Sequence, residues 1–221
     1  YLPDDNVRSI AAAPDGKAVY FLTDAGVSTL EVRTTTLLER AQAIERVLNQ
    51  RHRREGMVAS CMLDDADHPT TQKIQDNDND GLWTAYHVAA MSLCYGATKD
   101  PEAKRSAAEG MHALYMLQNI SGVPGLVARS VLPNELGKKR NQQWQPAPDG
   151  EHYWKSDTSS DEIDGHYLAF YTFYEYIAKD DPEERALLEK QIRAVTDHLV
   201  DHDYQLVDWT GKRTRWGIWD P

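Results

Sequence analysis

The chain has 221 residues, of which 41% are hydrophobic and 27% charged, and its formal net charge is -11 at pH 7. This length is enough to bury a sizeable core in one or two domains. The acidic balance argues against a protein that binds nucleic-acid phosphates, because such proteins normally present a basic surface. No apolar run approaches the roughly 20 residues that a bilayer-spanning helix needs, so the sequence predicts no membrane span.

The two cysteines, Cys61 and Cys94, are too few for a disulfide framework or a zinc cluster. The first residue is Tyr1, no signal peptide precedes the first elements, and the chain stops at Pro221 just after a hairpin-like stretch. We therefore expect the chain to be a fragment or a processed piece of a longer polypeptide.

Residues 1–33 are expected to form a small antiparallel β meander. Three short runs rich in β-branched residues, 7–12, 18–23 and 26–32, are separated by turn signals at Pro14–Lys17 and Asp24–Gly26. The segments Leu2–Ile10, Pro14–Gly16 and Thr23–Ser28 resemble one blade repeat of the two-component-regulator type of β-propeller. This resemblance implies that residues 1–33 are a domain of their own, the last blade of a propeller.

From residue 34 onward the sequence predicts mainly helix. Apolar periodicity and Asp-Pro turns place helices over residues 34–54, 80–97, 101–119, 161–178 and 182–202. Short strands are expected at 56–62 and 125–131, and a β-hairpin at 205–216. Residues 63–75 are expected to form a polar loop, and residues 132–160 a long irregular loop.

The strongest pattern in the chain is a repeat with a period of 81 residues. A shift by this number aligns Asp80 with Asp161 and Asp100-Pro-Glu with Asp181-Pro-Glu. Each repeat is predicted to be a helix, an Asp-Pro-Glu turn, a second helix and a short strand that contains Leu-Val. Helical hairpins of this kind bury their faces only against neighbouring hairpins, so several are needed for stability.

Residues 34–221 resemble the (α/α) toroid of glycoside hydrolases, polysaccharide lyases and sugar epimerases, on the basis of this repeat and of the aromatic residues in its loops. The resemblance implies an incomplete toroid, completed by the rest of a larger polypeptide or by a homo-oligomer. It further implies an oligosaccharide or polysaccharide ligand and an extracytoplasmic protein, either periplasmic or secreted.

In such a toroid the first helix of each hairpin begins at a common rim, so Asp80 and Asp161 are expected at matching points. Helices pack about 8–10 Å apart, a separation that suits the two carboxyl groups of an inverting glycosidase. The candidate catalytic residues are Asp80, Asp157, Asp161 and Glu162. Helix capping is the alternative, because Ser159–Glu162 matches a capping box and Asn79 or Asp80 is a good N-cap.

Aromatic and charged residues near the same predicted rim are candidates for substrate binding. Aromatic rings stack on the apolar faces of sugars, the basic side chains could neutralise a carboxylated sugar or pair with the acidic loops, and the histidine lies in the first turn of a predicted inner helix. These candidates are Trp83, Tyr86, Arg129, Trp154, Lys155, His166, Tyr167 and Trp216.

Asp76, Asp78 and Asp80, followed by Gly81, match the first half of a calcium-binding loop of the EF-hand type. The twelfth position is His87, where that motif places a bidentate glutamate. Calcium is therefore a possible ligand of these three aspartates, and no cofactor is certain.

We expect a glycoside hydrolase that uses paired carboxylates. A noncatalytic glycan-binding or sensory module is the alternative from a different class. A polysaccharide lyase or sugar epimerase is a third possibility, which would use histidine or tyrosine as the base.

Overall fold

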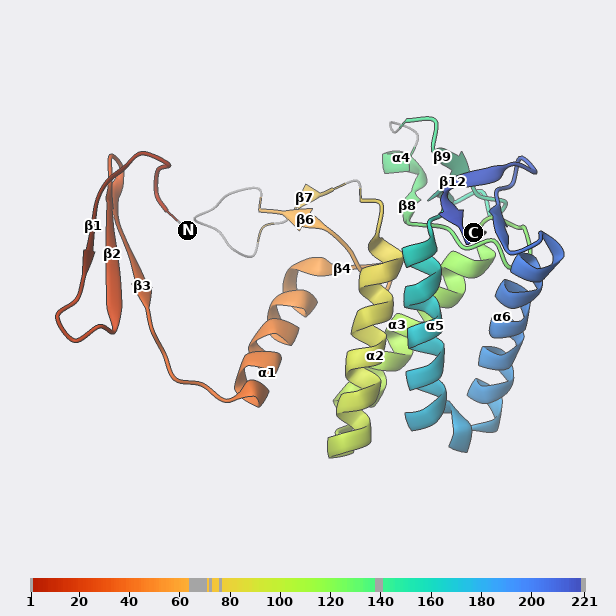
Figure 1. Cartoon of the computed structure of the whole chain (residues 1–221), viewed down its shortest axis with the longest axis horizontal. Helices are drawn as coiled ribbons and strands as arrows, with labels where there is room; N and C mark the ends of the chain where they lie inside the picture. Colours follow the sequence, from red (N-terminus) through yellow and green to blue (C-terminus); the bar gives the residue numbers. More distant parts are fainter. Residues whose placement is uncertain (1, 64–70, 72, 76, 138–140, 220–221) are drawn as a thin grey trace. The chain divides into compact units, whose positions relative to one another are not determined.

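The computed structural model describes residues 2–63, 71, 73–75, 77–137 and 141–219, and it divides the chain into two compact units (Figure 1). The first unit comprises residues 1–51 and 63–72, and the second comprises residues 52–62 and 73–221. The boundary that the sequence predicts, between residues 33 and 34, lies inside the first unit.

The first unit contains the β meander that the sequence predicts. Strands β1 (Val7–Ala12), β2 (Ala18–Thr23) and β3 (Gly26–Glu31) form an antiparallel sheet in the order β1-β2-β3. Helix α1 (Leu37–Val47) follows. It begins with a capping box, in which Thr36 Oγ1 accepts a hydrogen bond from Glu39 N over 3.1 Å. The α-helix ends earlier than residue 54, because a π-helical turn occupies Leu48–His52.

Two helical hairpins make up the body of the second unit (Figure 1). The first consists of α2 (Asp80–Thr98) and α3 (Pro101–Asn119), and the second of α5 (Ser160–Tyr176) and α6 (Pro182–Asp201). Asp100 and Asp181 cap the second helix of each hairpin, accepting hydrogen bonds from Glu102 N over 3.0 Å and from Glu184 N over 3.2 Å. The predicted helices and their Asp-Pro turns are confirmed.

The first helices of the two hairpins, α2 and α5, pack directly against each other. Glycines allow the close approach: a Cβ atom at Gly165 on α5 would lie 2.8 Å from Leu82 Cδ1 on α2, and one at Gly81 on α2 would lie 3.3 Å from Glu162 Cδ on α5. The core between the four helices is apolar, and its largest fully buried side chains include Met111, Leu114, Leu117, Leu126, Phe173, Leu188 and Leu206.

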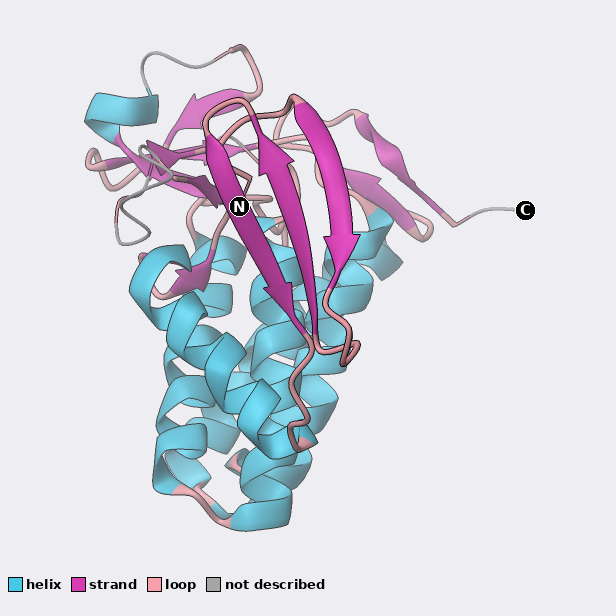
Figure 2. Ribbon diagram, turned by 90° about the vertical axis from the view of Figure 1, so that its left-hand side faces the viewer, coloured by secondary structure: helices cyan, strands magenta, loops and turns pink. Residues whose placement is uncertain are grey.

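Short strands gather at one end of the helices of the second unit (Figure 2). This is the end at which α2 and α5 begin (Figure 1). Strands β8 (Val131–Pro133), β9 (Trp144–Pro146) and β10 (His152–Lys155) form an antiparallel sheet in the order β8-β10-β9, and the one-turn helix α4 (Asn134–Gly137) follows β8. The prediction of an irregular loop at 132–160 is therefore wrong. The strand predicted at 125–131 is also wrong for most of its length, because a strand begins only at Val131.

Three two-stranded sheets complete this unit. Strand β4 (Arg53–Arg54) pairs with β5 (Met57–Val58), β6 (Cys61–Met62) pairs with β7 (Lys73–Ile74), and β11 (Gln205–Val207) pairs with β12 (Arg213–Ile218). The last pair confirms the predicted C-terminal hairpin. In the described part of the chain, no helix combines the length and the apolar character that a membrane crossing requires.

Candidate functional site

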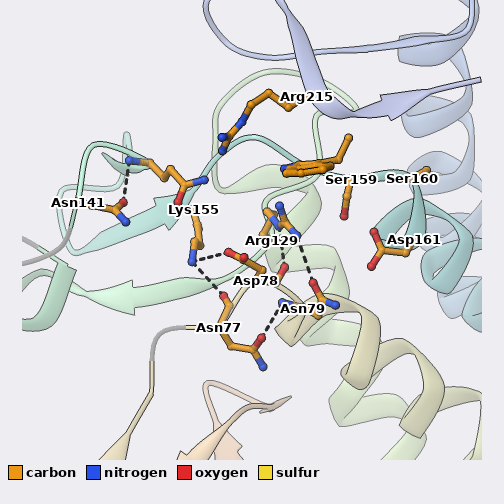
Figure 3. Close-up of a pocket in the computed structure, with 12 residues that line it drawn as sticks. Asn77, Asp78, Asn79, Arg129, Asn141, Lys155, Ser159, Ser160, Asp161 and Arg215 are labelled. Carbon is orange, nitrogen blue, oxygen red and sulfur yellow. Dashed lines mark hydrogen bonds and ion pairs between the residues drawn. The ribbon is translucent and has the colours of Figure 1, made fainter.

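A polar pocket with a volume of about 920 Å³ opens where α2 and α5 begin (Figure 3). Amide, hydroxyl and charged side chains form most of its wall, and a tryptophan ring completes it. The lining residues are Asn77, Asp78, Asn79, Arg129, Asn141, Gln143, Lys155, Ser159, Ser160, Asp161, Arg215 and Trp216. Such a wall suits a ligand with many hydrogen-bonding groups.

Arg129 is a buried cation that joins the loops leading into α2 and α5. Its Nε donates to the carbonyl oxygen of Asp78 over 2.7 Å, and its Nη1 donates to the carbonyl oxygen of Asp157 over 3.0 Å. Its Nη2 donates to Oδ1 of Asn79 over 3.2 Å. These three partners are uncharged groups, so they orient the guanidinium without neutralising it.

Lys155 extends from β10 into the same pocket and pairs with Asp78. Its Nζ lies 2.7 Å from Oδ1 of Asp78 and donates to the carbonyl oxygen of Asn77 over 3.4 Å. The ammonium group also lies 5.6 Å from the centroid of the Trp144 ring, within reach of a cation–π interaction. The hydrogen bond from Lys155 lowers the pKa of Asp78, which keeps this carboxylate ionised at neutral pH.

Asp157 holds the C-terminal hairpin against the pocket. Its Oδ1 accepts from the backbone N–H of Arg215 over 3.0 Å, and its Oδ2 accepts from Arg215 Nε over 2.7 Å. Asp157 has a φ of 63°, a left-handed conformation that is uncommon outside glycine. The Arg215 guanidinium lies 5.6 Å from the ring centroid of Trp216, which remains 56% exposed in the pocket wall.

Asp161, in the first turn of α5, presents its carboxylate to the pocket (Figure 3). No hydrogen bond or ion pair joins this carboxylate to another residue that the structure describes, whereas Asp78 and Asp157 each have a cationic partner. Of the four predicted catalytic residues, Asp161 is the one that lines the pocket. It also lies near the positive end of the α5 dipole.

Asp80 is fully buried at the start of α2 and does not line the pocket. It forms an ion pair with Arg54 and accepts hydrogen bonds from Ser130 Oγ over 2.5 Å and from Ser60 N over 3.3 Å. Burial raises the pKa of Asp80, and Arg54 opposes this shift. Through Arg54 and Ser130, these contacts connect β4 and the segment before β8 to the start of α2.

Glu162 and His166 lie one turn apart on α5, and both are fully buried. Neither carboxyl oxygen of Glu162 has a hydrogen-bond partner of good geometry among the described residues, although Leu82 N–H lies nearby. His166 Nδ1 lies 2.8 Å from Nε2 of Gln118. Burial raises the pKa of Glu162 well above its usual value and lowers the pKa of His166 to about 3.

The helix-capping alternative is right about the N-cap positions of Ser159 and Asn79 and wrong about the capping hydrogen bonds. Ser159 and Asn79 occupy the N-cap positions of α5 and α2, but neither side chain makes a capping hydrogen bond. Asn79 is bonded to Arg129 instead. Glu162 is directed toward Gly81 of α2, since a Cβ atom at Gly81 would meet Glu162 Oε2 at 2.2 Å.

The predicted aromatic residues do not converge on one surface. Trp154 is 2% exposed and belongs to the core. Tyr167 is half-buried, and its hydroxyl lies 2.7 Å from Oγ1 of Thr196 on α6. Trp83 and Tyr86 are exposed on α2 with ring centroids 6.3 Å apart, but neither lines the polar pocket. Trp216 is the predicted aromatic residue that does line it.

The two predicted calcium ligands that the structure describes, Asp78 and Asp80, each pair with a different cation. Asp76 lies outside the described residues, Asp78 pairs with Lys155, and Asp80 pairs with Arg54. Among the residues that the structure describes, no group of three or more His, Cys, Asp or Glu side chains is arranged to hold a metal ion. Calcium binding stays a prediction, which thermal unfolding with and without the ion would test.

Comparisons of the chain with models of protein families, with curated proteins and with solved structures find no match. The residues of the pocket therefore carry the functional inference.

Several lining residues are ones that the sequence did not identify as part of a site. They share no period and come from three separate loops, the first turn of α5 and β12: Asn77, Asn79, Asn141, Gln143, Ser159, Ser160 and Arg215. Two features of the sequence could have indicated some of these residues. Asn77 and Asn79 alternate with the acidic residues before α2, and Arg215 stands beside Trp216 on the predicted hairpin.

Proposed function

We propose that the polar pocket binds an oligosaccharide. The observation that carries this proposal is the meeting of Asp161, a carboxylate with no partner among the described residues, with an exposed indole ring, Trp216, in a wall of amides and hydroxyls. Sugar hydroxyls can donate to the carboxylate and accept from amide N–H groups, while an apolar sugar face can stack on the indole.

The charges around the pocket favour a neutral sugar over an acidic one. Lys155 is balanced by Asp78, and Arg215 by Asp157. The charge of Arg129 is then matched by that of Asp161, so the cations and carboxylates balance among the described residues in and next to the lining. A carboxylated sugar would have to displace existing partners of Lys155 or Arg129, which would cost much of the energy that it gains.

The test of this proposal is a binding titration by calorimetry with neutral, uronate-containing and sulfated oligosaccharides. Asp161→Asn and Trp216→Ala should each weaken binding of the neutral ligand by roughly ten-fold, which is about 1.4 kcal/mol. Asp164→Asn, one turn further along α5, and Trp209→Ala are matched controls, because both side chains are exposed outside the pocket. Binding that is equally strong in all four variants would refute the assignment.

Hydrolysis at the same pocket is the second candidate, and it is favoured by the presence of two carboxylates, Asp78 and Asp161, in one lining. In the view of Figure 3, Arg129 is drawn between them. A glycosidase also needs a carboxyl group that is protonated at its working pH. Glu162 has the required raised pKa, but it is buried away from the pocket. The arrangement therefore supports binding better than hydrolysis.

Hydrolysis and binding are separated by product analysis of the same oligosaccharides. A hydrolase releases shorter sugars, and Asp161→Asn then abolishes release while the Kd changes much less. A binding module gives saturable binding and no product with the unchanged chain. Detection of product that persists in both Asp161→Asn and Asp78→Asn would exclude this carboxylate pair.

We further propose that the toroid resemblance reflects a need for a helical partner, either a further part of a longer polypeptide or a second copy of the chain. Exposed apolar side chains on α2 and α5 support this proposal. They include Trp83, Tyr86 and Leu93 on α2, and Leu168 and Tyr171 on α5.

A further inference from the structure

A second pocket, separate from the polar one, has a volume of about 590 Å³ and a largely aromatic wall. Three rings from three different segments meet there: Tyr167 on α5, Tyr204 in the turn after α6, and Trp219 after β12. Ile163 and Leu199 add aliphatic surface. The volume lies within the range of small-molecule sites. We refer to it as the aromatic pocket.

The backbone at Tyr204 is unusual and places its ring in this wall. Asp203 and Tyr204 have φ values of 54° and 60°, so two successive residues adopt the left-handed conformation. This conformation is rare for a bulky side chain and normally requires external support. The support here is a hydrogen bond of 2.8 Å from Tyr204 N to the carbonyl oxygen of Leu199 in the last turn of α6. This bond closes the C-terminal end of the helix.

The rings of this pocket are left open to water. Tyr204 is 65% exposed and Trp219 is 38% exposed, whereas Tyr167 is half-buried with its hydroxyl bonded to Thr196. The side chains of Tyr204 and Trp219 are therefore accessible to a ligand in this pocket.

The electrostatics of the aromatic pocket favour a cation. Asp164 and Asp203 both belong to its lining, and none of the lining residues that the structure describes is basic. The pocket also lies at the end of α6, which stops at Asp201, and the C-terminal end of a helix carries a partial negative charge. The overall charge of -11 adds a favourable long-range field.

We propose that the aromatic pocket binds an organic cation whose charge is spread over alkyl groups, such as a quaternary or methylated ammonium. The faces of aromatic rings attract cations, and alkylated ammonium groups lose less hydration on entry than a bare ammonium. The alkyl groups contact Leu199 and the ring edges, and the carboxylates of Asp164 and Asp203 balance the charge.

The decisive test uses the unchanged protein with two probes of equal shape. Choline is titrated against its neutral isostere 3,3-dimethylbutanol, and binding is followed by NMR chemical shifts. We expect saturable binding of choline and binding of the isostere that is at least about ten-fold weaker, because the isostere keeps the apolar contact but loses the cation–π and ionic attraction. Equal affinity for both probes, or no saturable binding of choline, would overturn the proposal.

Variants then locate the site. Tyr204→Leu and Trp219→Leu keep apolar bulk but remove the ring, and each should weaken choline binding about two- to five-fold. Asp203→Asn should weaken it by a similar factor. Trp209→Leu and Asp180→Asn are the matched controls: Trp209 is an exposed indole outside the pocket, and Asp180 lies before the start of α6, at its opposite end. A loss in the controls as large as in the pocket variants would place the cation elsewhere.

Discussion

At the scale of single residues, the most unusual feature is a pair of buried ionisable groups held in their neutral forms. Glu162 and His166 are fully buried on neighbouring turns of α5, and burial shifts the pKa of the acid upward and that of the imidazole downward. The unfolded chain gives both groups ordinary pKa values. Their effects on stability therefore have opposite dependence on pH.

The direction in which Glu162 makes folding stability depend on pH follows from proton linkage. Above a pH of about 4.3 the unfolded chain loses the proton of this carboxyl group while the folded chain keeps it, so the folded state loses relative stability as the pH rises toward the folded pKa. His166 behaves in the opposite way, and its contribution is lost as the pH falls from about 6.5 toward its folded pKa of about 3.

Glu162→Gln is accordingly expected to be more stable than the unchanged chain at pH 8 and to lose that advantage toward pH 4. The difference in free energy of unfolding should change by at most about 1.4 kcal/mol per pH unit, the value for one proton. Urea denaturation at several pH values measures it. Asp164→Asn, an exposed acid-to-amide change on the same helix, is the control. A gap between Glu162→Gln and the unchanged chain that stays constant from pH 4 to pH 8 would contradict this assignment.

At the scale of elements, the helices were predictable because their signals are local. Apolar residues recur at helical spacing, and Asp100-Pro101 and Asp181-Pro182 combine a side-chain cap with a proline at the first helical position. Strands β8, β9 and β10 were not predictable, because each has only three or four residues. Their pairing joins β8 to β10 across the intervening α4 and β9, and no periodicity encodes such a contact.

The candidate site was predictable only in part, for related reasons. Asp161 and Trp216 were identified from loop position and residue type, and both line the polar pocket. The ion pair of Asp80 with Arg54 spans 26 residues of sequence and depends on how β4 packs beside α2. The burial of Trp154 likewise follows from the position of β10 within its sheet. Such contacts arise from tertiary packing.

The loop after α3 contains a glycine that both its backbone and its surroundings require. Gly125 has a φ of 76°, and a Cβ atom there would meet the carbonyl oxygen of Ala194 on α6 at 2.0 Å. Gly150 has the same φ of 76°, but nothing lies within 4 Å of a Cβ atom at that position. The two glycines separate the effect of backbone conformation from the effect of steric crowding.

We expect Gly150→Ala to cost about 1–2 kcal/mol of unfolding free energy, which is the price of a left-handed conformation for alanine. Gly125→Ala should cost at least about 2 kcal/mol more, because α6 must also move away from the loop. Chemical denaturation of both variants measures the difference. Equal losses would show that the contact between this loop and α6 yields without strain.

At the scale of the whole molecule, the second unit carries exposed apolar side chains on α2 and α5, which together are called the apolar face. On α2, Trp83, Tyr86 and Leu93 are spaced so that they share one side of the helix, and Leu168 and Tyr171 are exposed on α5. Large apolar side chains that are exposed on the same side of a helix often mark an interaction site.

The chain is therefore expected to self-associate as its concentration rises in sedimentation equilibrium. The double change Leu93→Glu with Tyr171→Glu should shift association to at least about ten-fold higher concentration, because it places charges on the apolar face. Leu187→Glu, a comparable change on α6, is the control. A chain that stays monomeric at every concentration would indicate that this face awaits a different partner.

Asp157 links two walls of the polar pocket through different parts of one residue. Its carboxylate holds Arg215 beside Trp216, while its carbonyl oxygen holds Arg129. Movement of the C-terminal hairpin is therefore coupled to the opposite wall, and the coupling is reciprocal. A sugar that binds at Trp216 would stabilise the docked hairpin. Loosening the hairpin would reduce the affinity for the sugar by the same factor. Protection of the β12 amides from hydrogen exchange would then report occupancy of the pocket.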